Sequence, residues 1–521
     1  MTFHSQPSYL VDRVLIADAN FEEDELYLTL REPPPTTLPA MPPTHFLSIA
    51  RSPFSGPNSS GVASNRGFDT STVAAADFDV DPKTGFMPPK VPVVRLDGEL
   101  EVWETMREAA VEGGEPLTLG VYATSRQQKR SARWRSAVDS MPILSLDSIR
   151  QSEVLLRRAH SVLTFILHFY IHSQPPLTIP QPHPPISIPP SLSVPLIALS
   201  KELSLPPILT YSDNVLYNWT LIDPKAPISI SNIAMDATFS LTPSEAHFYI
   251  TSARIEIQGV EALELMRSCM DEAFIADTLS LRRITDYLQR LARVIDAMAI
   301  LLMAVRDECN PEVFFSQIRP WFKGWEPGSR EWLFEGVDEE DQKKYAKMSG
   351  PSAGQSSLIH ALDVFLGVDH TPHSRRDTPS ATVHDKPTFL MMMEMYMPRH
   401  HRAFLQHLRA ANQTHVRSLI KSGKGTSSVV HQALEAAYDE AVTALKKFRD
   451  GHIRIATLYI VSQARKASAN GEAALVSPLA PAKVVDEEVR GTGGTSLVPF
   501  LKEARDNTSR TTLSARHGHS S

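Results

Sequence analysis

Apolar side chains recur at steps of three and four residues between Leu281 and Val305, and this periodicity constrains the fold more than any other feature of the sequence. Such spacing is typical of one face of a long helix packed against a core. Asn310-Pro311 then ends this helix and begins another, because asparagine caps helices and proline suits the first helical position. Since the same periodicity fills most of the C-terminal half, we predict an all-α bundle there. Strands are expected only at 91–94 and 228–233.

Proline-rich and polar segments interrupt the helical periodicity. The sequence holds 40 prolines, and they are densest at residues 33–43 and 175–207. Because proline lacks a backbone donor and favours extended conformations, we expect these segments to be linkers or surface insertions. Pro320 is expected to bend a helix, and Pro398 to open or bend one. The polar stretches that we interpret as linkers in the same way are 52–81, 370–386 and 467–494.

The composition excludes several classes of protein. The 521 residues are enough for about three domains of average size. The net charge of -7 includes no basic stripe, which argues against nucleic-acid and anionic-membrane partners. Two cysteines, Cys269 and Cys309, cannot build a disulfide framework or a thiolate metal site, whereas 19 histidines leave a cofactor held by imidazole open. With no secretory signal and no apolar run of about 18 residues, we expect a cytoplasmic protein without a membrane partner.

The helix predicted at 428–465 carries a histidine, His452, in the middle of its apolar stripe. This residue is either a satisfied core histidine or a ligand, and the spacing alone leaves both open. Gly451 leaves room for a bulky group beside it, and Arg449 shares its side of the helix. Arg449 either pairs with an anion such as a propionate or is a surface arginine. Six further histidines fit no standard metal-site spacing and are expected to face solvent: His360, His370, His373, His384, His400 and His401.

Four segments match one known family in the same order along the chain. Phe448-Arg449-Asp450-Gly451-His452-Ile453-Arg454 resembles the proximal haem segment of the indoleamine 2,3-dioxygenase family. Residues 310–319 resemble the family's distal-pocket helix, and 350–357 follow it at a plausible distance. Residues 491–495 resemble its glycine-rich active-site loop. Neither glycine-rich segment has the Gly-Lys-Ser/Thr ending of a nucleotide-binding loop, which argues against that alternative.

The resemblance implies the fold and the domain organisation. In the N-terminal half, residues 211–219 resemble the segment that roofs the distal pocket, and 248–256 resemble the helix that opens the large domain. The implied fold is an all-α, two-domain arrangement with haem between the domains. We assign 1–240 to a small N-terminal domain with proline-rich insertions, 241–505 to a large haem-binding catalytic domain, and 506–521 to a disordered tail.

The resemblance also implies which residues hold the cofactor. His452 would be the proximal iron ligand of haem b, and Arg449 would contact a haem propionate. Ser352, Ala353 and Gly354 would line the space beside the haem. A single histidine ligand leaves the sixth position of the iron open for dioxygen.

On the substrate side, Arg319 would pair with the carboxylate of an amino-acid substrate through two hydrogen bonds, a geometry that lysine cannot reproduce. Ser252 would line the space near dioxygen, and Thr492 would close over the polar end of the substrate. Aromatic and apolar side chains would hold the indole ring: Tyr211, Val215, Phe248 and Phe315. The candidate catalytic residues among these are Arg319, Phe315 and Ser252, although the spacing alone also allows Phe315 to be plain core.

The activity implied by the resemblance is cleavage of the indole C2–C3 bond of L-tryptophan by dioxygen, giving N-formylkynurenine. This is the first step of the kynurenine pathway towards NAD. It needs an external reductant that keeps the iron ferrous, and we expect a monomer. The alternatives are a haem protein that binds dioxygen without turning over tryptophan, for which Arg319 would have no use, and a low-activity paralogue. Asn214 stands where compact animal members have a small thiol, so the range of indole substrates is open.

Overall fold

A computed structural model describes residues 78–176, 184–326, 329–370, 388–412, 416–422, 428–470, 491 and 496–514. All of them belong to one compact unit, Thr37–Ser521. Helices dominate the described residues and the strands are short, so the predicted all-α class is confirmed. The domain boundary expected at residue 240 falls just before helix α7, Pro243–Gln258, and stays a prediction.

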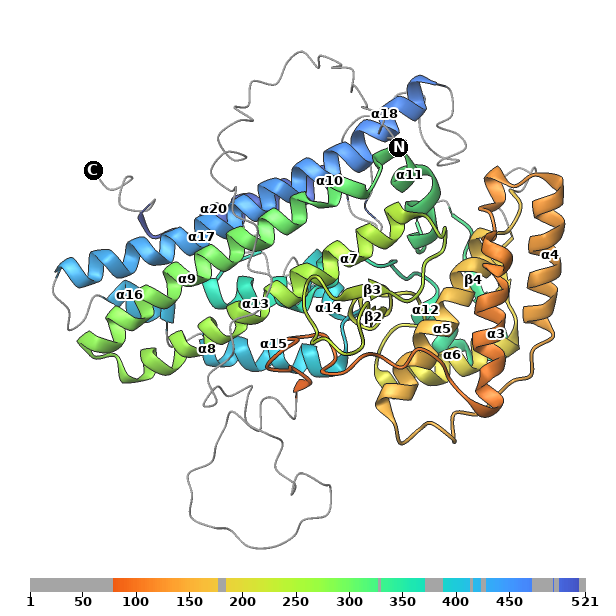
Figure 1. Cartoon of the computed structure of the whole chain (residues 1–521), viewed down its shortest axis with the longest axis horizontal. Coiled ribbons are helices and arrows are strands. Elements are labelled where there is room, and N and C mark those ends of the chain that lie inside the picture. The colour runs from red at the N-terminus through yellow and green to blue at the C-terminus, as the bar shows by residue number, and fades with distance from the viewer. Residues whose placement is uncertain are drawn as a thin grey trace, which may run out of the picture. The chain divides into compact units, whose positions relative to one another are not determined.

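Figure 1 labels the elements in chain order. The α-helices are α3 (Glu101–Ala109), α4 (Ser125–Asp139), α5 (Glu153–His172), α6 (Pro190–Leu203), α7 (Pro243–Gln258), α8 (Val260–Ile275), α9 (Thr278–Met303), α10 (Val305–Glu308), α11 (Pro311–Val313), α12 (Glu339–Tyr345), α13 (Ser357–Leu366), α14 (Phe389–Glu394), α15 (Arg399–Asn412), α16 (Val416–Ser422), α17 (Ser428–Ala456), α18 (Ser462–Ala469) and α20 (Leu497–Ser509). The 3-10 turns are η1 (Gly98–Leu100), η2 (Glu112–Gly114), η3 (Gly120–Tyr122), η6 (Arg319–Phe322) and η7 (Ala353–Gln355), and the π turns are η4 (Ser212–Leu216), η5 (Phe314–Ile318) and η9 (Thr457–Val461).

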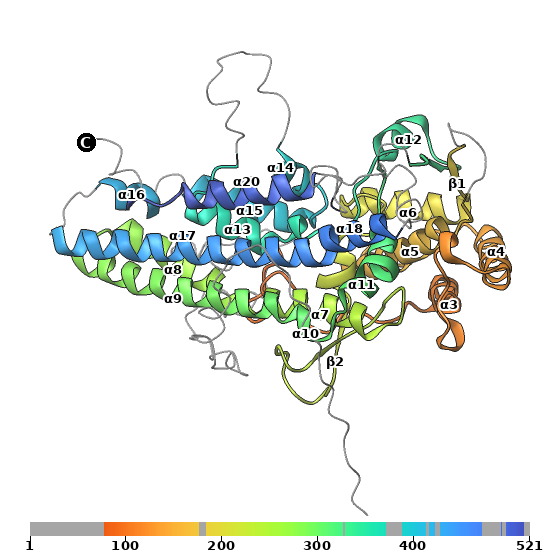
Figure 2. The ribbon, with the colours of Figure 1, turned by 90° about the horizontal axis from the view of Figure 1, so that it is seen from above.

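The two longest helices, α9 and α17, run side by side and build one core (Figures 1 and 2). The predicted stripe, which runs along α9 and into the start of α10, is buried from Leu281 to Val305 except at Leu302, which is partly exposed. The helix ends as predicted, and the side chain of Asn310 accepts hydrogen bonds from the amides of Glu312 and Val313. Since α15 begins directly after Pro398, that expectation is also confirmed.

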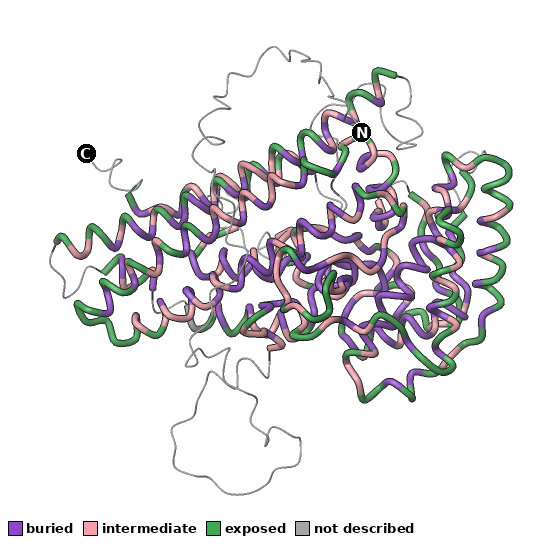
Figure 3. The backbone as a smooth tube through the Cα atoms, in the orientation of Figure 1, coloured by how far each residue is buried: buried purple, intermediate pink, exposed green. Residues whose placement is uncertain are grey.

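A second core surrounds α5, which is buried along most of its length (Figure 3). Its rings stack with those of distant segments: Phe165 lies 4.6 Å from Phe239 between ring centroids, and Phe239 lies 5.5 Å from Trp321 with the planes 6° apart. Among the described residues, α5 alone is long and apolar enough to cross a membrane, but 89% of that window is buried inside the protein. Such burial is typical of the central helix of a protein core.

The described part of the proline-rich segment, 184–207, is core, so the expectation that it is an insertion is wrong. Pro190 takes the first position of α6, where a missing N–H is tolerated. Leu192, Leu196 and Leu199 are completely buried. The apolar residues between the prolines keep helical spacing, and this outweighs the proline content. Residues 33–43 and almost all of the three polar stretches lie outside the described residues.

The strands of the described part form two short ladders. Strand β1 (Ile186–Ile188) pairs in parallel with β4 (Trp332–Phe334), and β2 (Trp219–Leu221) pairs antiparallel with β3 (Ile233–Met235). The strand predicted at 91–94 does not form, and the one at 228–233 forms only at its last residue. Both segments are rich in apolar residues, but a strand also needs a neighbouring strand whose backbone groups are free to form hydrogen bonds with it.

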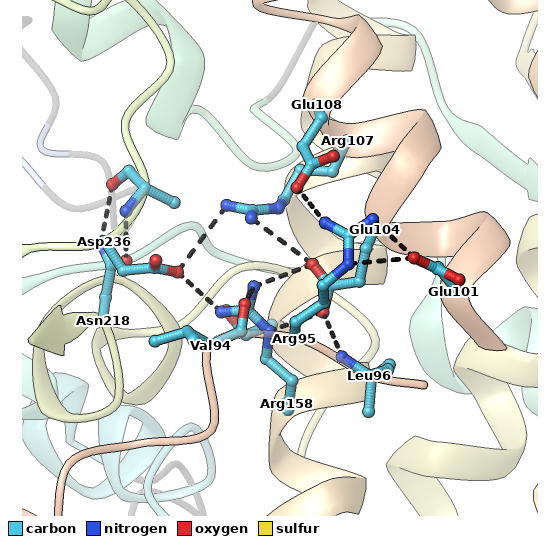
Figure 4. Close-up of polar contacts among 12 residues, drawn as sticks. Val94, Arg95, Leu96, Glu101, Glu104, Arg107, Glu108, Arg158, Asn218 and Asp236 are labelled. Atoms are coloured by element: carbon cyan, nitrogen blue, oxygen red, sulfur yellow. Dashed lines mark hydrogen bonds and ion pairs between the residues drawn. The ribbon is translucent and has the colours of Figure 1, made fainter. Parts of the chain in front are cut away.

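Buried charges attach α3 to α5 (Figure 4). Arg158 binds Glu104 through Nε and Nη2 at 2.7 and 2.8 Å, and it binds Asp236 through Nη1 at 2.7 Å. Arg107 lies 3.4 Å from Glu104 and 3.8 Å from Asp236. Two cations thus face two carboxylates, the balance that buried charges require. Since the side chain of Asn218 donates to the carbonyl oxygen of Ala237 and accepts from its amide, directly after Asp236, the cluster also holds the segment that follows η4.

The C-terminal helix α20 continues into the region predicted to be a tail. It packs on α17 and buries Asn507 and Thr508, and Leu513 beyond it is buried as well. The carboxylate of Asp439 on α17 accepts hydrogen bonds from the amides of Leu513 and Ser514. The boundary predicted at 506 is therefore too early, and residues 515–521 lie outside the described part.

Candidate functional site

His452 lies where the apolar stripe of α17 is least covered. Leu445 and Phe448 before it and Ile455 after it are buried, whereas His452 is partly exposed. Burial and the positive charge of Arg449 lower the pKa of His452 to about 4, and no hydrogen bond to a described residue contributes. The imidazole is therefore neutral near pH 7, which is the form that binds metal ions.

The space next to Gly451 does not belong to a ligand, so that expectation is wrong. A Cβ atom at Gly451 would lie 3.4 Å from the sulfur of Met303 and 3.7 Å from a methyl carbon of Leu302, both on α9. The glycine faces the crossing of α17 and α9. Any ligand of this helix would lie on the side of His452 itself.

Arg449 is buried and bound to the carboxylate of Asp363 on α13. Its Nη2 lies 2.6 Å from both carboxylate oxygens, and its Nη1 contacts the hydroxyl of Thr508. Burial alone would raise the pKa of Asp363, but the charges of Arg449 and His370 hold it well below its usual range. Arg449 is thus no surface arginine, and its contact with a propionate stays a prediction.

The predicted distal helix changes type twice within a few residues. Helix α11 passes into the π turn η5 at Phe314 and into the 3-10 turn η6 at Arg319, with Pro320 in the first turn of η6. The regular α-helix expected through Pro320 therefore does not form, and the bend at this residue stays a prediction. Phe315 and Arg319 are each 6% exposed. Burial lowers the pKa of the Arg319 guanidinium, although the charge of Glu326 opposes this shift.

An aromatic chain joins three elements of the predicted pocket. The ring centroid of Phe248 on α7 lies 4.7 Å from that of Phe314 on η5, and Phe314 lies 5.5 Å from Tyr459 on η9. Since η9 continues α17, the chain connects Phe248 and the distal turn to the helix of His452. The site predicted from the sequence includes Phe315 but not Phe314, because a π turn rotates adjacent positions away from the regular helical faces.

The turn η4 places the predicted roof against α7. Tyr211 and Val215 are buried in one apolar cluster with residues of α7. The Tyr211 hydroxyl donates to Glu256 Oε1 at 2.9 Å, and its amide donates to Gln355 Oε1 at 2.8 Å. The structure therefore brings together the roof, the helix of Phe248 and the loop before α13.

Glu256 is a buried carboxyl group at this meeting point, and it is not among the site residues predicted from the sequence. Ser356 and Tyr211 both donate to its Oε1, at 2.6 and 2.9 Å, and Oε2 has no hydrogen-bond partner among the described residues. Burial raises the pKa of Glu256 to about 7, although the two hydrogen bonds oppose the shift. Ser252, which is partly exposed, lies one helical turn earlier. The available signal was a lone acid between two isoleucines, Ile255 and Ile257.

The loop predicted beside the cofactor is held by short-range hydrogen bonds. Ser352 Oγ accepts the amide of Gly354 at 3.2 Å, and the Gly354 carbonyl oxygen lies 2.9 Å from Nε2 of His360. Ala353 is exposed, and its two neighbours are partly exposed. Thr492 lies outside the described residues.

Two of the six histidines expected to face solvent are buried, so that expectation is wrong for His360 and His401. His360 is held by Gly354 and, at 3.2 Å, by a carboxylate oxygen of Glu394. His360 is buried because the helix that carries it, α13, is buried along most of its length. His373 and His384 lie outside the described part.

The donor set fits haem better than a bare metal ion. Within the described ranges, no group of three or more histidine, cysteine, aspartate or glutamate side chains could hold an ion. Haem iron takes its equatorial nitrogens from the porphyrin and can use one histidine from the protein. The neutral and partly exposed His452 meets that requirement.

Comparison with known proteins agrees with the motifs. The sequence model of the family described as indoleamine 2,3-dioxygenase matches residues 74–511. The chain is 31% identical over 451 residues to the indoleamine 2,3-dioxygenase of Saccharomyces cerevisiae, covering 83% of this chain and 92% of that protein. It is 32% identical over 382 residues to the human indoleamine 2,3-dioxygenase 2, covering 73% and 84%. It is 28% identical over 433 residues to the 6-hydroxytryptophan 2,3-dioxygenase of Fusarium equiseti, covering 82% and 96%.

Proposed function

Because the chain belongs to the indoleamine 2,3-dioxygenase family, we propose that it uses haem b and dioxygen to cleave the indole C2–C3 bond of L-tryptophan, giving N-formylkynurenine. Family membership makes the chain a dioxygenase and thus an oxidoreductase. L-Tryptophan is the finer part of the proposal, since one relative is named for 6-hydroxytryptophan. The reaction would open the kynurenine pathway towards NAD.

One observation supports this proposal above the others: a buried arginine and a neutral histidine lie on segments that are linked through the contact of η5 with η9. Arg319 follows η5 directly, and η5 packs on α7 and on η9, which continues the helix of His452. A guanidinium removed from water attracts a carboxylate more strongly than an exposed one does, because the interaction is screened less. An amino-acid substrate carries such a carboxylate, whereas a carrier of dioxygen has no use for this group.

Each proposed residue has a physical task. His452 would hold haem b through its neutral ring, and the bound haem would supply an iron that binds and activates dioxygen. Arg319 would orient the substrate through two hydrogen bonds to its carboxylate. Tyr211, Val215 and Phe248, together with Phe315, would hold the indole ring and exclude water.

The remaining predicted residues would act around the cofactor and the entrance. Arg449 would reach a propionate while it is held by Asp363, and residues 352–354 would line the haem edge. Ser252 would lie near the reacting ring, and Thr492 would close over the substrate's polar end. We further propose a cytoplasmic monomer that depends on an external reductant.

Haem binding is tested by purifying the full chain and recording its Soret band. His452→Ala should lose the band, because the iron loses its protein ligand. His431→Ala is the matched control, since His431 lies on the same helix and pairs with Glu435 at 3.5 Å. A His452→Ala protein with an unchanged spectrum would contradict the ligand assignment.

Turnover is tested with L-tryptophan under ascorbate and methylene blue, by following N-formylkynurenine. Arg319→Lys should keep the haem and lower kcat/KM by about 10- to 100-fold, because one of two charge-assisted hydrogen bonds is lost. Arg290→Lys is the control, because Arg290 is 47% exposed and pairs with Glu261. A haem-loaded natural chain that forms no product would favour the dioxygen-binding alternative.

A further inference from the structure

Three histidines on α5 have no part in the proposed chemistry, yet all of them bind the segments that carry the predicted substrate residues. His160, His168 and His172 follow one another at intervals of eight and four residues, so they share one side of the helix. His160 and His168 are completely buried. Buried imidazoles are costly unless they are hydrogen-bonded, and the identity of their partners shows what they hold.

His168 connects the two walls of the predicted site, which are the roof segment that carries Tyr211 and the distal turn that carries Arg319. Its Nδ1 lies 2.6 Å from the carbonyl oxygen of Trp321, and its Nε2 lies 3.3 Å from the amide nitrogen of Leu209. A carbonyl only accepts and an amide N–H only donates, so these partners assign the proton to Nδ1. Burial lowers the pKa of His168 to about 4, which agrees with a neutral ring. Trp321 is two residues from Arg319, and Leu209 is two residues from Tyr211.

His160 fixes the start of the roof turn. Its Nδ1 lies 2.8 Å from Asp213 Oδ1, and its Nε2 lies 3.1 Å from the carbonyl oxygen of Pro206. Both partners are acceptors, so both ring nitrogens donate and the ring is a cation. Burial would lower the pKa of His160, but the Asp213 carboxylate raises it. Asp213 also accepts hydrogen bonds from the amide and the hydroxyl of Thr210, at 2.8 and 2.7 Å.

The distal side is held at a second point and by ring packing. Nε2 of His172 lies 3.0 Å from the carbonyl oxygen of Lys323. The Trp321 ring lies 5.2 Å from that of Phe169 on α5, between centroids. A densely packed core transmits displacement, so a shift of α5 would move the turn that carries Arg319.

We propose that the α5 histidines are positioning residues that set the separation between the roof and the distal turn, so that Tyr211 and Arg319 can engage one substrate molecule. Both walls are otherwise irregular turns, η4 and η5–η6, and irregular turns need tertiary support to keep one geometry. Misplacing a binding group by about 1 Å is enough to lower catalysis strongly. The identity of the substrate rests on the proposed function, whereas the tethers are a property of the chain itself.

His168→Phe is the decisive variant, because it keeps a ring of similar shape and removes both hydrogen bonds. We expect KM for L-tryptophan to rise about tenfold, which lies within the range for the loss of two net hydrogen bonds, while kcat falls by less than about threefold. His168→Gln should recover part of KM, since its amide can still bind one of the two segments. His401→Phe is the control, because His401 is a completely buried ring of α15 that packs on Phe86 at 4.9 Å.

Amide hydrogen exchange measured on the full-length, haem-loaded chain separates this inference from the proposed function. In His168→Phe, the amides of 206–216 and 319–325 should exchange about tenfold faster, because their local opening costs less free energy. If the natural chain cleaves no tryptophan, the proposed function fails while the exchange result still decides the tether. Unchanged exchange in both segments, or an equal rise of KM in His401→Phe, would overturn the inference.

Discussion

Glutamine in place of Glu256 tests whether a carboxyl group buried between η4 and α7 is protonated in the folded chain. Both hydrogen bonds to this side chain end on Oε1, so the amide oxygen of glutamine can accept them from Tyr211 and Ser356. The amide nitrogen then replaces Oε2, the oxygen without a described partner. The variant therefore copies the shape of the protonated acid and cannot ionise.

The expected effect follows from the pKa of Glu256 in the two states. Burial raises it from an ordinary value of 4.5 to about 7 in the folded chain. Between these values the folded chain binds more protons than the unfolded chain, so its free energy of unfolding falls as the pH rises. The difference of 2.5 pH units corresponds to roughly 3 kcal/mol. This contribution is fully present below pH 4.5 and is lost as the pH rises through 7.

Urea denaturation of both chains at pH 5 and pH 8, followed by tryptophan fluorescence, measures this loss. The advantage of Glu256→Gln over the natural chain should grow by about 2 to 3 kcal/mol between the two pH values. Glu339→Gln is the control, because Glu339 is 94% exposed and should show no such growth. An advantage of Glu256→Gln that does not change with pH would mean that Glu256 is ionised in the folded chain, and the reasoning would be refuted.

Three other substitutions test the buried contacts by urea denaturation. Asp363→Asn should destabilise the chain by about 3 to 5 kcal/mol at pH 7, because it leaves the guanidinium of Arg449 buried beside a neutral group; a loss below about 1 kcal/mol would contradict this. Since the pKa of Asp363 is held below its usual range, this stabilisation is present above that range and is lost as the pH falls. Arg158→Lys should cost about 1 to 3 kcal/mol, because lysine cannot make both hydrogen bonds to Glu104, and an equally stable variant would show that charge alone suffices. Gly451→Ala should be tolerated, since its Cβ would meet Met303 at 3.4 Å, whereas Gly451→Leu should clash with α9, and equal stability of the two would argue against that crossing.

The fold could be predicted wherever a local pattern decides it. The stripe from Leu281 to Val305 specifies a buried helical face, and Asn310-Pro311 marks its end, because both depend only on neighbouring residues. Segment 184–207 differs from the prediction because the leucines between its prolines keep helical spacing and are buried. Strand β3 pairs with a strand that ends 12 residues earlier, and no local property of 228–233 shows that this partner exists.

The candidate site divides in the same way. His452 and Arg319 could be proposed from the sequence because each lies in a segment with a distinctive motif. Glu256 could not, because its role depends on a hydroxyl that lies 45 residues earlier and another that lies 100 residues later. Phe314 could not be proposed either, because helical spacing does not hold through a π turn.

The hydrogen bonds of the α5 histidines represent a third class of contact, because their partners are backbone groups and not side chains of complementary charge. The partner of Arg158 is 54 residues away and that of Arg449 is 86 away, but both are carboxylates, so charge restricts the search. His168 binds a carbonyl 153 residues away and an amide 41 residues away. Every residue has a carbonyl, and every residue except proline has an amide, so the identity of Trp321 or Leu209 carries no signal for these bonds. Only the fold can distinguish a histidine that is merely buried from one that sets the distance between two walls of a site.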